Sequence, residues 1–400
     1  MASDLQQRRE SLIVQAKIDV NLANDNEVII HTVSRSFASD TITVPTKEMY
    51  QYALLSSLGD DVYEEPSTIR LQNHVAKLFG KEAALFVSSG SMSNQIALRA
   101  HLTQPPHSLL CDVRAHIHCY EAGGAAYHSQ AAVTAVMPSN GHHLTAEDVK
   151  KHLVVIDDVH FAPTRVIALE NTLNGCIFPQ EEILAISELA KLHGIRMHLD
   201  GARIWHVAAE TGTPLAELAE PFDSISCCFS KGLGAPVGSC LIGTKEFIHR
   251  ARWLRKLFGG AMRQTGILAG SAAYALSNNL QLLPGVHDLT KKLEKGLIDL
   301  GCIITSPAET CMVFYDPSPL ELSYDEIQER AAQLPDPIKT GGSRLVVHIQ
   351  TSPQMIDDFL NLLKTLATEK GVELPAKPKR VNGEMDPRDI YVRVSKAKKA

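Results

Sequence analysis

The chain has 400 residues, of which 44% are hydrophobic and 21% are charged, and its formal net charge is -6. This length and balance are typical of a soluble globular protein with one large domain and a smaller one. The negative charge gives no electrostatic footprint for nucleic acid, and Gln, Asn, Gly and Pro interrupt the longest uncharged run, 264–287, which argues against a membrane span.

The first part of the chain reads as an N-terminal arm followed by alternating helices and strands. Residues 1–35 are weakly patterned, and 36–54 ends in a helix for which Thr46 is the expected N-cap. An amphipathic helix is predicted from Thr68 onward. Residues 84–102 then give a strand, a Ser/Gly turn and a second helix. The N–H groups that open such a helix favour a phosphate, although Ser-Ser-Gly-Ser is also a common capping pattern.

The centre of the chain contains short apolar runs that are typical of buried strands in an α/β sheet. They are Val166–Leu169, Arg196–Leu199 and Ser224–Phe229. Asp200 follows the second run and Lys231 follows the third, so both are expected at carboxyl ends of strands, where open α/β sheets bind ligands. This pair fits pyridoxal 5'-phosphate (PLP), because the amine can form a Schiff base with its aldehyde and the carboxylate can keep its pyridine nitrogen protonated. Either residue alone is explained as well by a solvated lysine or a helix N-cap.

From residue 285 the pattern changes to short strands and helices that suggest a small α+β domain. The sequence therefore predicts an N-terminal arm (1–50), a PLP-binding large domain (51–284), a small C-terminal domain (285–370) and a basic, flexible tail (371–400). The eight cysteines form no Cys-x-x-Cys pair. We therefore expect reduced core thiols, no metal site and a cytoplasmic protein.

Several long motifs resemble those of the low-specificity L-threonine aldolases, in particular their eukaryotic, fungal-like branch. The motifs are HLDGARIW (198–205), SKGLGAPVGS (230–239) and WLRKLFGGAMRQTGILAG (253–270), and the resemblance extends from about Phe37 to Ser352. It implies the PLP fold type I of aspartate aminotransferase: an α/β large domain with a mostly parallel, mixed seven-stranded sheet flanked by helices, and a small α+β C-terminal domain. It also implies a homodimer or homotetramer with active sites at the subunit interface.

The resemblance implies a role for each candidate site residue. Lys231 is the Schiff-base lysine, Asp200 is the partner of the pyridine nitrogen, and His116 stacks on the cofactor and can transfer protons. Arg203 is expected on the same helix face as Asp200, one turn later. The residues implied to bind the cofactor are Ser89, Gly90, Ser91, Met92, His116, Glu170, Asp200, Arg203, Lys231 and, from the neighbouring subunit, Arg263. The residues implied to bind the substrate are Ser39, Tyr63, Arg203, Lys256 and Arg344, of which Arg344 grips the α-carboxylate with its guanidinium fork.

Three positions depart from the family pattern. Ala38 stands where members usually have an arginine, and the loop that holds Tyr63 is shorter than in the family. Leu173 stands where many bacterial members have a histidine near the substrate hydroxyl. The identity of the group that accepts the β-hydroxyl proton is therefore open. Without the resemblance, Ser39 would be read as a turn-forming hydroxyl.

The implied activity is aldol cleavage of L-threonine, L-allo-threonine and related β-hydroxy-α-amino acids to glycine and an aldehyde, which is acetaldehyde for threonine. Arg344, Arg203 and Ser39 are implied to hold the substrate carboxylate, and this fixes which bond at Cα lies perpendicular to the cofactor ring and breaks. If this is the Cα–H bond, the same site would racemise alanine, with His116 and Tyr63 as candidate acid/base residues opposite Lys231. A third alternative is a PLP-free binding protein, but Lys231, Asp200 and the Ser89–Ser91 turn are all present.

Overall fold

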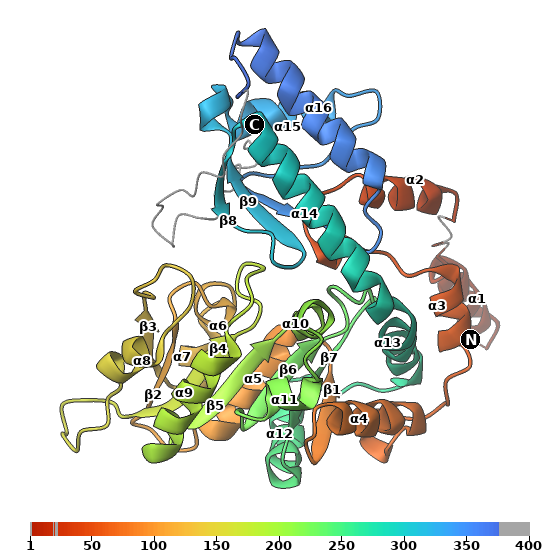
Figure 1. Cartoon of the computed structure of the whole chain (residues 1–400). Helices are drawn as coiled ribbons and strands as arrows, with labels where there is room; N and C mark the ends of the chain where they lie inside the picture. The colour runs from red at the N-terminus through yellow and green to blue at the C-terminus, as the bar shows by residue number, and fades with distance from the viewer. Residues whose placement is uncertain (1, 19, 21–22, 376–400) are drawn as a thin grey trace.

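The structure is a computed structural model that describes residues 2–18, 20 and 23–375, so most of the predicted tail lies outside the described residues. Its main feature is a sheet of seven strands in the order β1-β7-β6-β5-β4-β2-β3 (Figure 1). Only β7 runs antiparallel to its neighbours, and the other pairings in this sheet are parallel. The predicted mixed, mostly parallel α/β sheet is therefore confirmed.

The strands of the large sheet are short, and most of their residues are buried. The apolar runs in the centre of the sequence form β4, β5 and β6, which lie next to one another in the sheet. The strands are β1 (Ala83–Val87), β2 (Ser108–Asp112), β3 (Ala132–Val136), β4 (Thr164–Glu170), β5 (Arg196–Gly201), β6 (Ser224–Cys228) and β7 (Ser239–Gly243).

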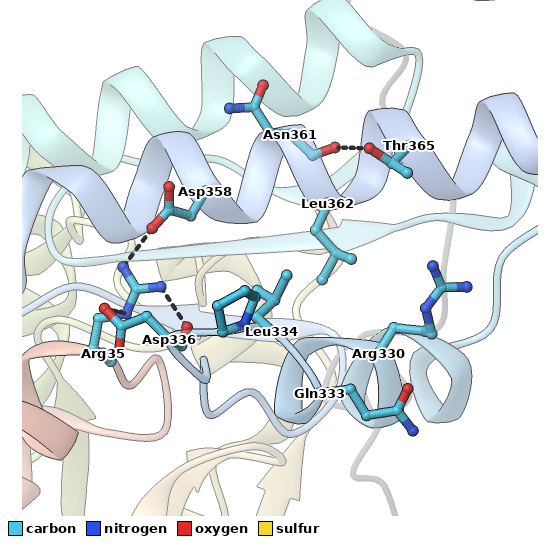
Figure 2. Close-up of a pocket in the computed structure, with 10 residues that line it drawn as sticks. Arg35, Arg330, Gln333, Leu334, Asp336, Asp358, Asn361, Leu362 and Thr365 are labelled. Atoms are coloured by element: carbon cyan, nitrogen blue, oxygen red, sulfur yellow. Dashed lines mark hydrogen bonds and ion pairs between the residues drawn. The ribbon is translucent and has the colours of Figure 1, made fainter.

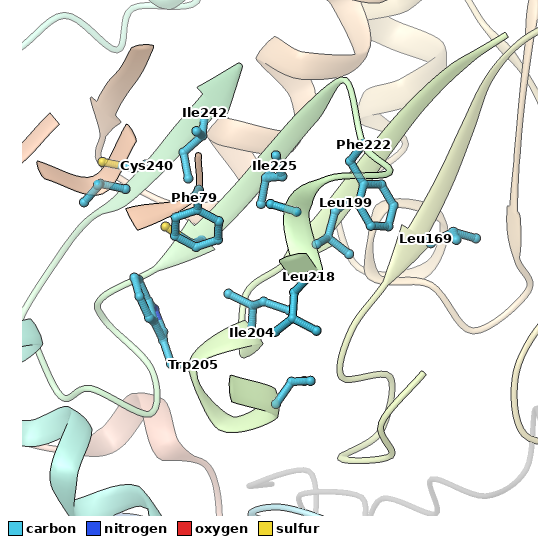
Figure 3. Close-up of a cluster of buried hydrophobic side chains, with 14 of the residues drawn as sticks. Phe79, Leu169, Leu199, Ile204, Trp205, Leu218, Phe222, Ile225, Cys240 and Ile242 are labelled. Atoms are coloured by element: carbon cyan, nitrogen blue, oxygen red, sulfur yellow. The ribbon is translucent and has the colours of Figure 1, made fainter. Parts of the chain in front are cut away.

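Helices cover both faces of this sheet because both faces of its strands are apolar. In β4, Ile167 and Leu169 enter one hydrophobic cluster, whereas Val166 and Ala168 enter another on the opposite face. Figure 3 shows the larger cluster, in which Trp205 packs beside Phe79 with ring centroids 5.5 Å apart. The helices from the arm through the large sheet are α1 (Ala2–Gln15), α2 (Ala23–Ser34), α3 (Lys47–Ala53), α4 (Pro66–Leu78), α5 (Gly90–His101), α6 (His116–Cys119), α7 (Gly124–Ser129), α8 (Ala146–His152), α9 (Gln180–Leu192), α10 (Ile204–Thr211), α11 (Leu215–Ala219), α12 (Lys245–Leu257) and α13 (Gly266–Asn279).

A second, antiparallel sheet of three strands in the order β10-β9-β8 lies in the upper part of Figure 1. Its own hydrophobic cluster includes Phe314, Leu345 and Phe359. The predicted alternation of strands and helices after residue 285 is present. The boundary between the large and the small domain at residue 284 stays a prediction. One long helix, α14, leads from the large sheet to the small one. The elements are α14 (Leu283–Leu300), β8 (Ile303–Ser306), β9 (Met312–Asp316), α15 (Tyr324–Ala332), β10 (Arg344–Val346) and α16 (Pro353–Glu369).

Polar contacts anchor the N-terminal region to these elements. Thr46 accepts a hydrogen bond from the N–H of Met49, so the predicted N-cap of α3 is confirmed. Arg35 is buried and pairs with Asp358 on α16 at 2.6 Å, and it also contacts Asp336, as Figure 2 shows at a surface hollow. None of the predicted site residues lines this hollow. No helix in the described part of the chain is long and apolar enough to cross a membrane.

A buried ion pair between Asp61 and Arg255 of α12 is expected to contribute strongly to stability. Arg255 also donates to the carbonyl oxygen of Phe86 at 2.7 Å, so the pair ties the 61–63 turn to α12 and β1. Asp61→Ala should lower the free energy of unfolding by about 3–5 kcal/mol, because it leaves a buried guanidinium without its counter-charge. Lys295→Ala, which removes an exposed pair with Asp299, should change it by less than about 0.5 kcal/mol. Urea unfolding of both variants tests this, and equal shifts of the midpoint would contradict it.

Candidate active site

Three polar residues meet at the carboxyl edge of the large sheet because β4, β5 and β6 are adjacent and parallel. Glu170 is the last residue of β4 and is paired in register with Asp200 of β5. Lys231 follows the end of β6 by three residues and is partly buried. The structure thus brings Lys231, Asp200 and Glu170 to one edge of the sheet, as the sequence predicts for the first two.

Asp200 is a buried carboxylate held by two neutral donors. The side-chain amide of Asn94 donates to Oδ2 at 2.8 Å, and the backbone N–H of Ala202 donates to Oδ1 at 3.1 Å. Asp200 itself belongs to β5, and α10 begins only after Arg203. The prediction that Arg203 lies one helical turn after Asp200 on the same face is therefore wrong. Backbone pairing of β5 with its neighbours keeps Asp200 in an extended strand, and a turn separates it from α10. The spacing of residues along a helix therefore does not apply between Asp200 and Arg203.

Arg203 forms a bidentate pair with Asp40, a residue that the sequence analysis did not single out. Nε donates to Oδ2 at 2.8 Å and Nη2 donates to Oδ1 at 2.6 Å. Burial opposes ionisation of Asp40, but the guanidinium of Arg203 outweighs it and holds the pKa of Asp40 well below its ordinary value. Asp40 therefore carries a charge in the interior and fixes the plane of the guanidinium. In the sequence, the signal that Asp40 belongs to the site was its position directly after Ser39, a predicted substrate-binding residue.

His116 is oriented by a second carboxylate that sequence reasoning missed. Its Nδ1 lies 2.8 Å from Oε1 of Glu121, which is fully buried, whereas the histidine ring is partly exposed. The hydrogen bond to Glu121 outweighs burial and, with the negative charge of Asp200, raises the pKa of His116. Because Nδ1 faces Glu121, Nε2 is the ring nitrogen left for a ligand.

Glu170, at the same edge of the sheet, has a strongly raised pKa. Its Oε2 accepts a hydrogen bond from the backbone N–H of His116 at 2.8 Å. Burial raises the pKa of Glu170 to about 8, with a further contribution from Asp200, against the opposing effects of His116 and Lys231. Its carboxyl group is therefore largely protonated at neutral pH in the ligand-free protein.

The raised pKa of Glu170 predicts a pH dependence of stability. Ionisation of Glu170 is less favourable in the folded chain than in the unfolded chain. The contribution of Glu170 to the free energy of unfolding is therefore full below pH 4.5 and is lost as the pH rises toward 8. Glu170→Gln cannot ionise, and its free energy of unfolding relative to the parent chain should therefore increase between pH 5 and pH 9. Urea unfolding of the ligand-free proteins at several pH values measures this difference. The exposed Glu181→Gln variant should show a constant difference, and the same flat result for Glu170→Gln would contradict the prediction.

The Ser/Gly turn before α5 forms a possible anion site. Ser89 is the N-cap of α5, and its hydroxyl accepts from the N–H of Met92 at 3.1 Å. Gly90 is required because a Cβ there would lie 2.8 Å from Sγ of Cys228, at the end of β6. The N–H groups of Gly90 and Ser91 lie in the first turn, where the helix dipole favours a negative group such as a phosphate.

The predicted carboxylate-binding residues gather around residues 38–41. Ser39 accepts a hydrogen bond from the N–H of Thr41 at 3.2 Å and caps a short 3-10 turn. Arg344, the first residue of β10, donates through Nη2 to the carbonyl oxygen of Ala38 at 3.1 Å. Arg203 contacts the same segment through Asp40. The guanidinium groups of Arg203 and Arg344 and the hydroxyl of Ser39 therefore all lie at residues 38–41.

The remaining predicted residues lie on the surface of the single chain. Tyr63 is 82% exposed, Lys256 is exposed, and the side chain of Arg263 is 73% exposed and pairs with Asp60 at 3.1 Å. Among the described residues, no hydrogen bond or ion pair joins them to Lys231 or Asp200. The roles predicted for these three residues stay predictions.

Comparisons with known proteins identify close relatives of this chain. Residues 36–318 match the family described as beta-eliminating lyase. A low-specificity L-threonine aldolase of Eremothecium gossypii is 45% identical over 329 residues, which cover 82% of this chain and 86% of that protein. An alanine racemase of Cochliobolus carbonum is 35% identical over 341 residues, covering 82% of this chain and 87% of that protein. The solved structure of a Leishmania major threonine aldolase matches 83% of this chain and 99% of its own chain, with a TM-score of 0.73 at 19% sequence identity.

Proposed function

The chain belongs to the beta-eliminating lyase family, among the low-specificity L-threonine aldolases, and we propose that it binds PLP and cleaves L-threonine and L-allo-threonine to glycine and acetaldehyde. The observation that carries the proposal is the placement of Asp200 and Lys231 at the carboxyl ends of two adjacent parallel strands. The N-terminus of α5 lies beside the second of these strands.

The residues at this edge of the sheet fit PLP. Lys231 would supply the amine for the cofactor aldehyde, and Asp200 would supply a fixed carboxylate for the pyridine nitrogen. The turn Ser89–Met92 offers N–H groups to the phosphate, and the partly exposed ring of His116 can lie on the cofactor face. When bound, PLP accepts the electron pair of the Cα–Cβ bond that breaks.

The substrate is oriented through its α-carboxylate. Arg344 and Arg203 provide positive charge and Ser39 provides a hydroxyl, and Asp40 keeps the guanidinium of Arg203 in one plane. Fixing the carboxylate would fix rotation about the Cα–N bond, and this would select which bond at Cα stands perpendicular to the cofactor ring. The side-chain carbon Cβ must occupy that position for cleavage, and Cα–H must occupy it for racemisation.

We assign transfer of the β-hydroxyl proton to His116. Leu173 is buried and has no group that can accept a proton. His116 is the ring whose basicity is raised by Glu121 and whose Nε2 is not engaged by that carboxylate. In cleavage, the hydroxyl proton leaves as the Cα–Cβ bond breaks, acetaldehyde departs, and Cα receives a proton to give glycine.

We also propose that the enzyme is a cytoplasmic homodimer or homotetramer. All eight cysteines lie in the described part of the chain and are free thiols, which is usual in a reducing compartment. The exposed Tyr63, Lys256 and Arg263 would then act in the site of a neighbouring subunit, with Arg263 on the cofactor phosphate.

Product analysis tests the proposed activity. Purified, PLP-loaded protein is given L-threonine, L-allo-threonine and L-alanine separately, and acetaldehyde, glycine and the alanine enantiomers are quantified. We expect acetaldehyde and glycine in equal amounts from at least one of the two threonines. D-alanine from L-alanine, with no acetaldehyde from either threonine, would overturn the aldolase assignment and favour a racemase.

A further inference from the structure

We propose that Asn94 is a positioning residue that holds the carboxylates of Asp200 and Glu121 with a single amide group. This inference goes beyond the proposed function but rests on it, since Asp200 and His116 are the residues proposed to contact the cofactor. It adds a residue from the middle of α5 to the helix whose N-terminus forms the proposed phosphate site.

The amide of Asn94 serves both carboxylates at once. Its Nδ2 donates to Oδ2 of Asp200 at 2.8 Å and to Oε1 of Glu121 at 2.9 Å, and all three side chains are buried. The same oxygen of Glu121 lies 2.8 Å from Nδ1 of His116. Asn94 therefore joins Asp200, the carboxylate proposed for the pyridine nitrogen, to the Glu121–His116 pair.

The orientation of this amide is fixed by its surroundings. If the amide were flipped, its oxygen would face two carboxylates, which can only accept hydrogen bonds. In the observed orientation its oxygen faces Nε2 of His198 at 3.1 Å, so His198 must carry its proton on Nε2. Burial lowers the pKa of His198 to about 4 and keeps this ring neutral.

A chain of hydrogen bonds continues behind His198 and completes the network. Because its proton is on Nε2, Nδ1 of His198 accepts from the hydroxyl of Ser224 at 2.8 Å. The Ser224 oxygen in turn lies 2.7 Å from Nε2 of His101, which can donate to it. Every donor along this path meets an acceptor, so the amide has one stable arrangement.

Without Asn94, the two carboxylates would face each other with fewer donors. One carboxylate oxygen of Asp200, one carboxylate oxygen of Glu121 and one ring nitrogen of His116 all lie within 4.8 Å of one another. Loss of the shared donor should allow the carboxylate of Asp200 to move, which would weaken its interaction with a protonated pyridine nitrogen. A residue with a purely structural role would change stability but not the affinity for the cofactor.

The matched control is the neighbouring residue, Gln95. Its Nε2 donates to the other oxygen of Glu121 at 2.6 Å, and no hydrogen bond joins it to Asp200 among the described residues. Asn94→Leu and Gln95→Leu both remove a buried amide that supports Glu121. Only Asn94→Leu also removes the donor to Asp200.

Titration of the full-length, cofactor-free proteins with PLP, followed by visible absorbance, tests the proposal, with urea unfolding as the measure of stability. We expect Asn94→Leu to raise the Kd for PLP about 10-fold or more, and Gln95→Leu to raise it less than about 3-fold. Unchanged PLP affinity in Asn94→Leu, or equal losses in both variants, would overturn the role of Asn94. Absence of PLP binding by the parent chain would instead overturn the proposed function.

Discussion

Replacing Lys231 by alanine is expected to abolish acetaldehyde release from L-threonine, with kcat reduced by at least about three orders of magnitude. The reason is that Lys231 follows β6 at the carboxyl edge of the sheet, so the variant lacks the amine proposed to attach to the cofactor. Acetaldehyde is measured with PLP in excess, so that weaker cofactor binding does not account for the loss.

The control for Lys231→Ala is Lys245→Ala. Lys245 is exposed and follows β7, which runs antiparallel to β6, so it lies at the opposite edge of the sheet. This variant should keep the parent rate. A Lys231→Ala protein that released acetaldehyde at a comparable rate would show that another group performs the chemistry.

Asp40→Asn is expected to lower both stability and activity. Asp40 is fully buried and accepts hydrogen bonds from Arg203 with both of its carboxylate oxygens, so the neutral amide leaves a mostly buried guanidinium without its counter-charge. Breaking such a pair costs about 3–5 kcal/mol of unfolding free energy. The rate should also fall, since Arg203 loses the contact that fixes its plane beside the proposed carboxylate site.

Urea unfolding and the acetaldehyde assay together measure the effect of Asp40→Asn. The exposed Asp299→Asn variant serves as the control and should change stability by less than about 0.5 kcal/mol. An unchanged urea midpoint for Asp40→Asn would mean that the pair with Arg203 adds nothing to the folded chain.

The features that the sequence predicted correctly depend on local patterns. The apolar runs before Asp200 and Lys231 form strands, so Asp200 lies near the end of β5 and Lys231 lies just after β6. The cap at Thr46 is also a local interaction. Such patterns are complete within a few residues, so they can be read without knowing the tertiary structure.

Two of the features that were missed, Asn94 and Asp40, depend on polar contacts between distant segments. Asn94 reaches Asp200 across 106 positions, and Asp40 reaches Arg203 across 163. No spacing rule links such residues, because the sheet order and not the chain order brings them together. The same limitation explains the error at Arg203, where helical spacing was applied across a strand and a turn.

The most direct test of the proposed function is to locate the covalent attachment of PLP. The PLP-loaded protein is reduced with borohydride and digested, and the peptides are analysed by mass spectrometry. The proposed function predicts a reduced pyridoxyl phosphate group on the peptide that contains Lys231, and none in Lys231→Ala. A modification on another lysine, with Lys231 unmodified, would contradict the site.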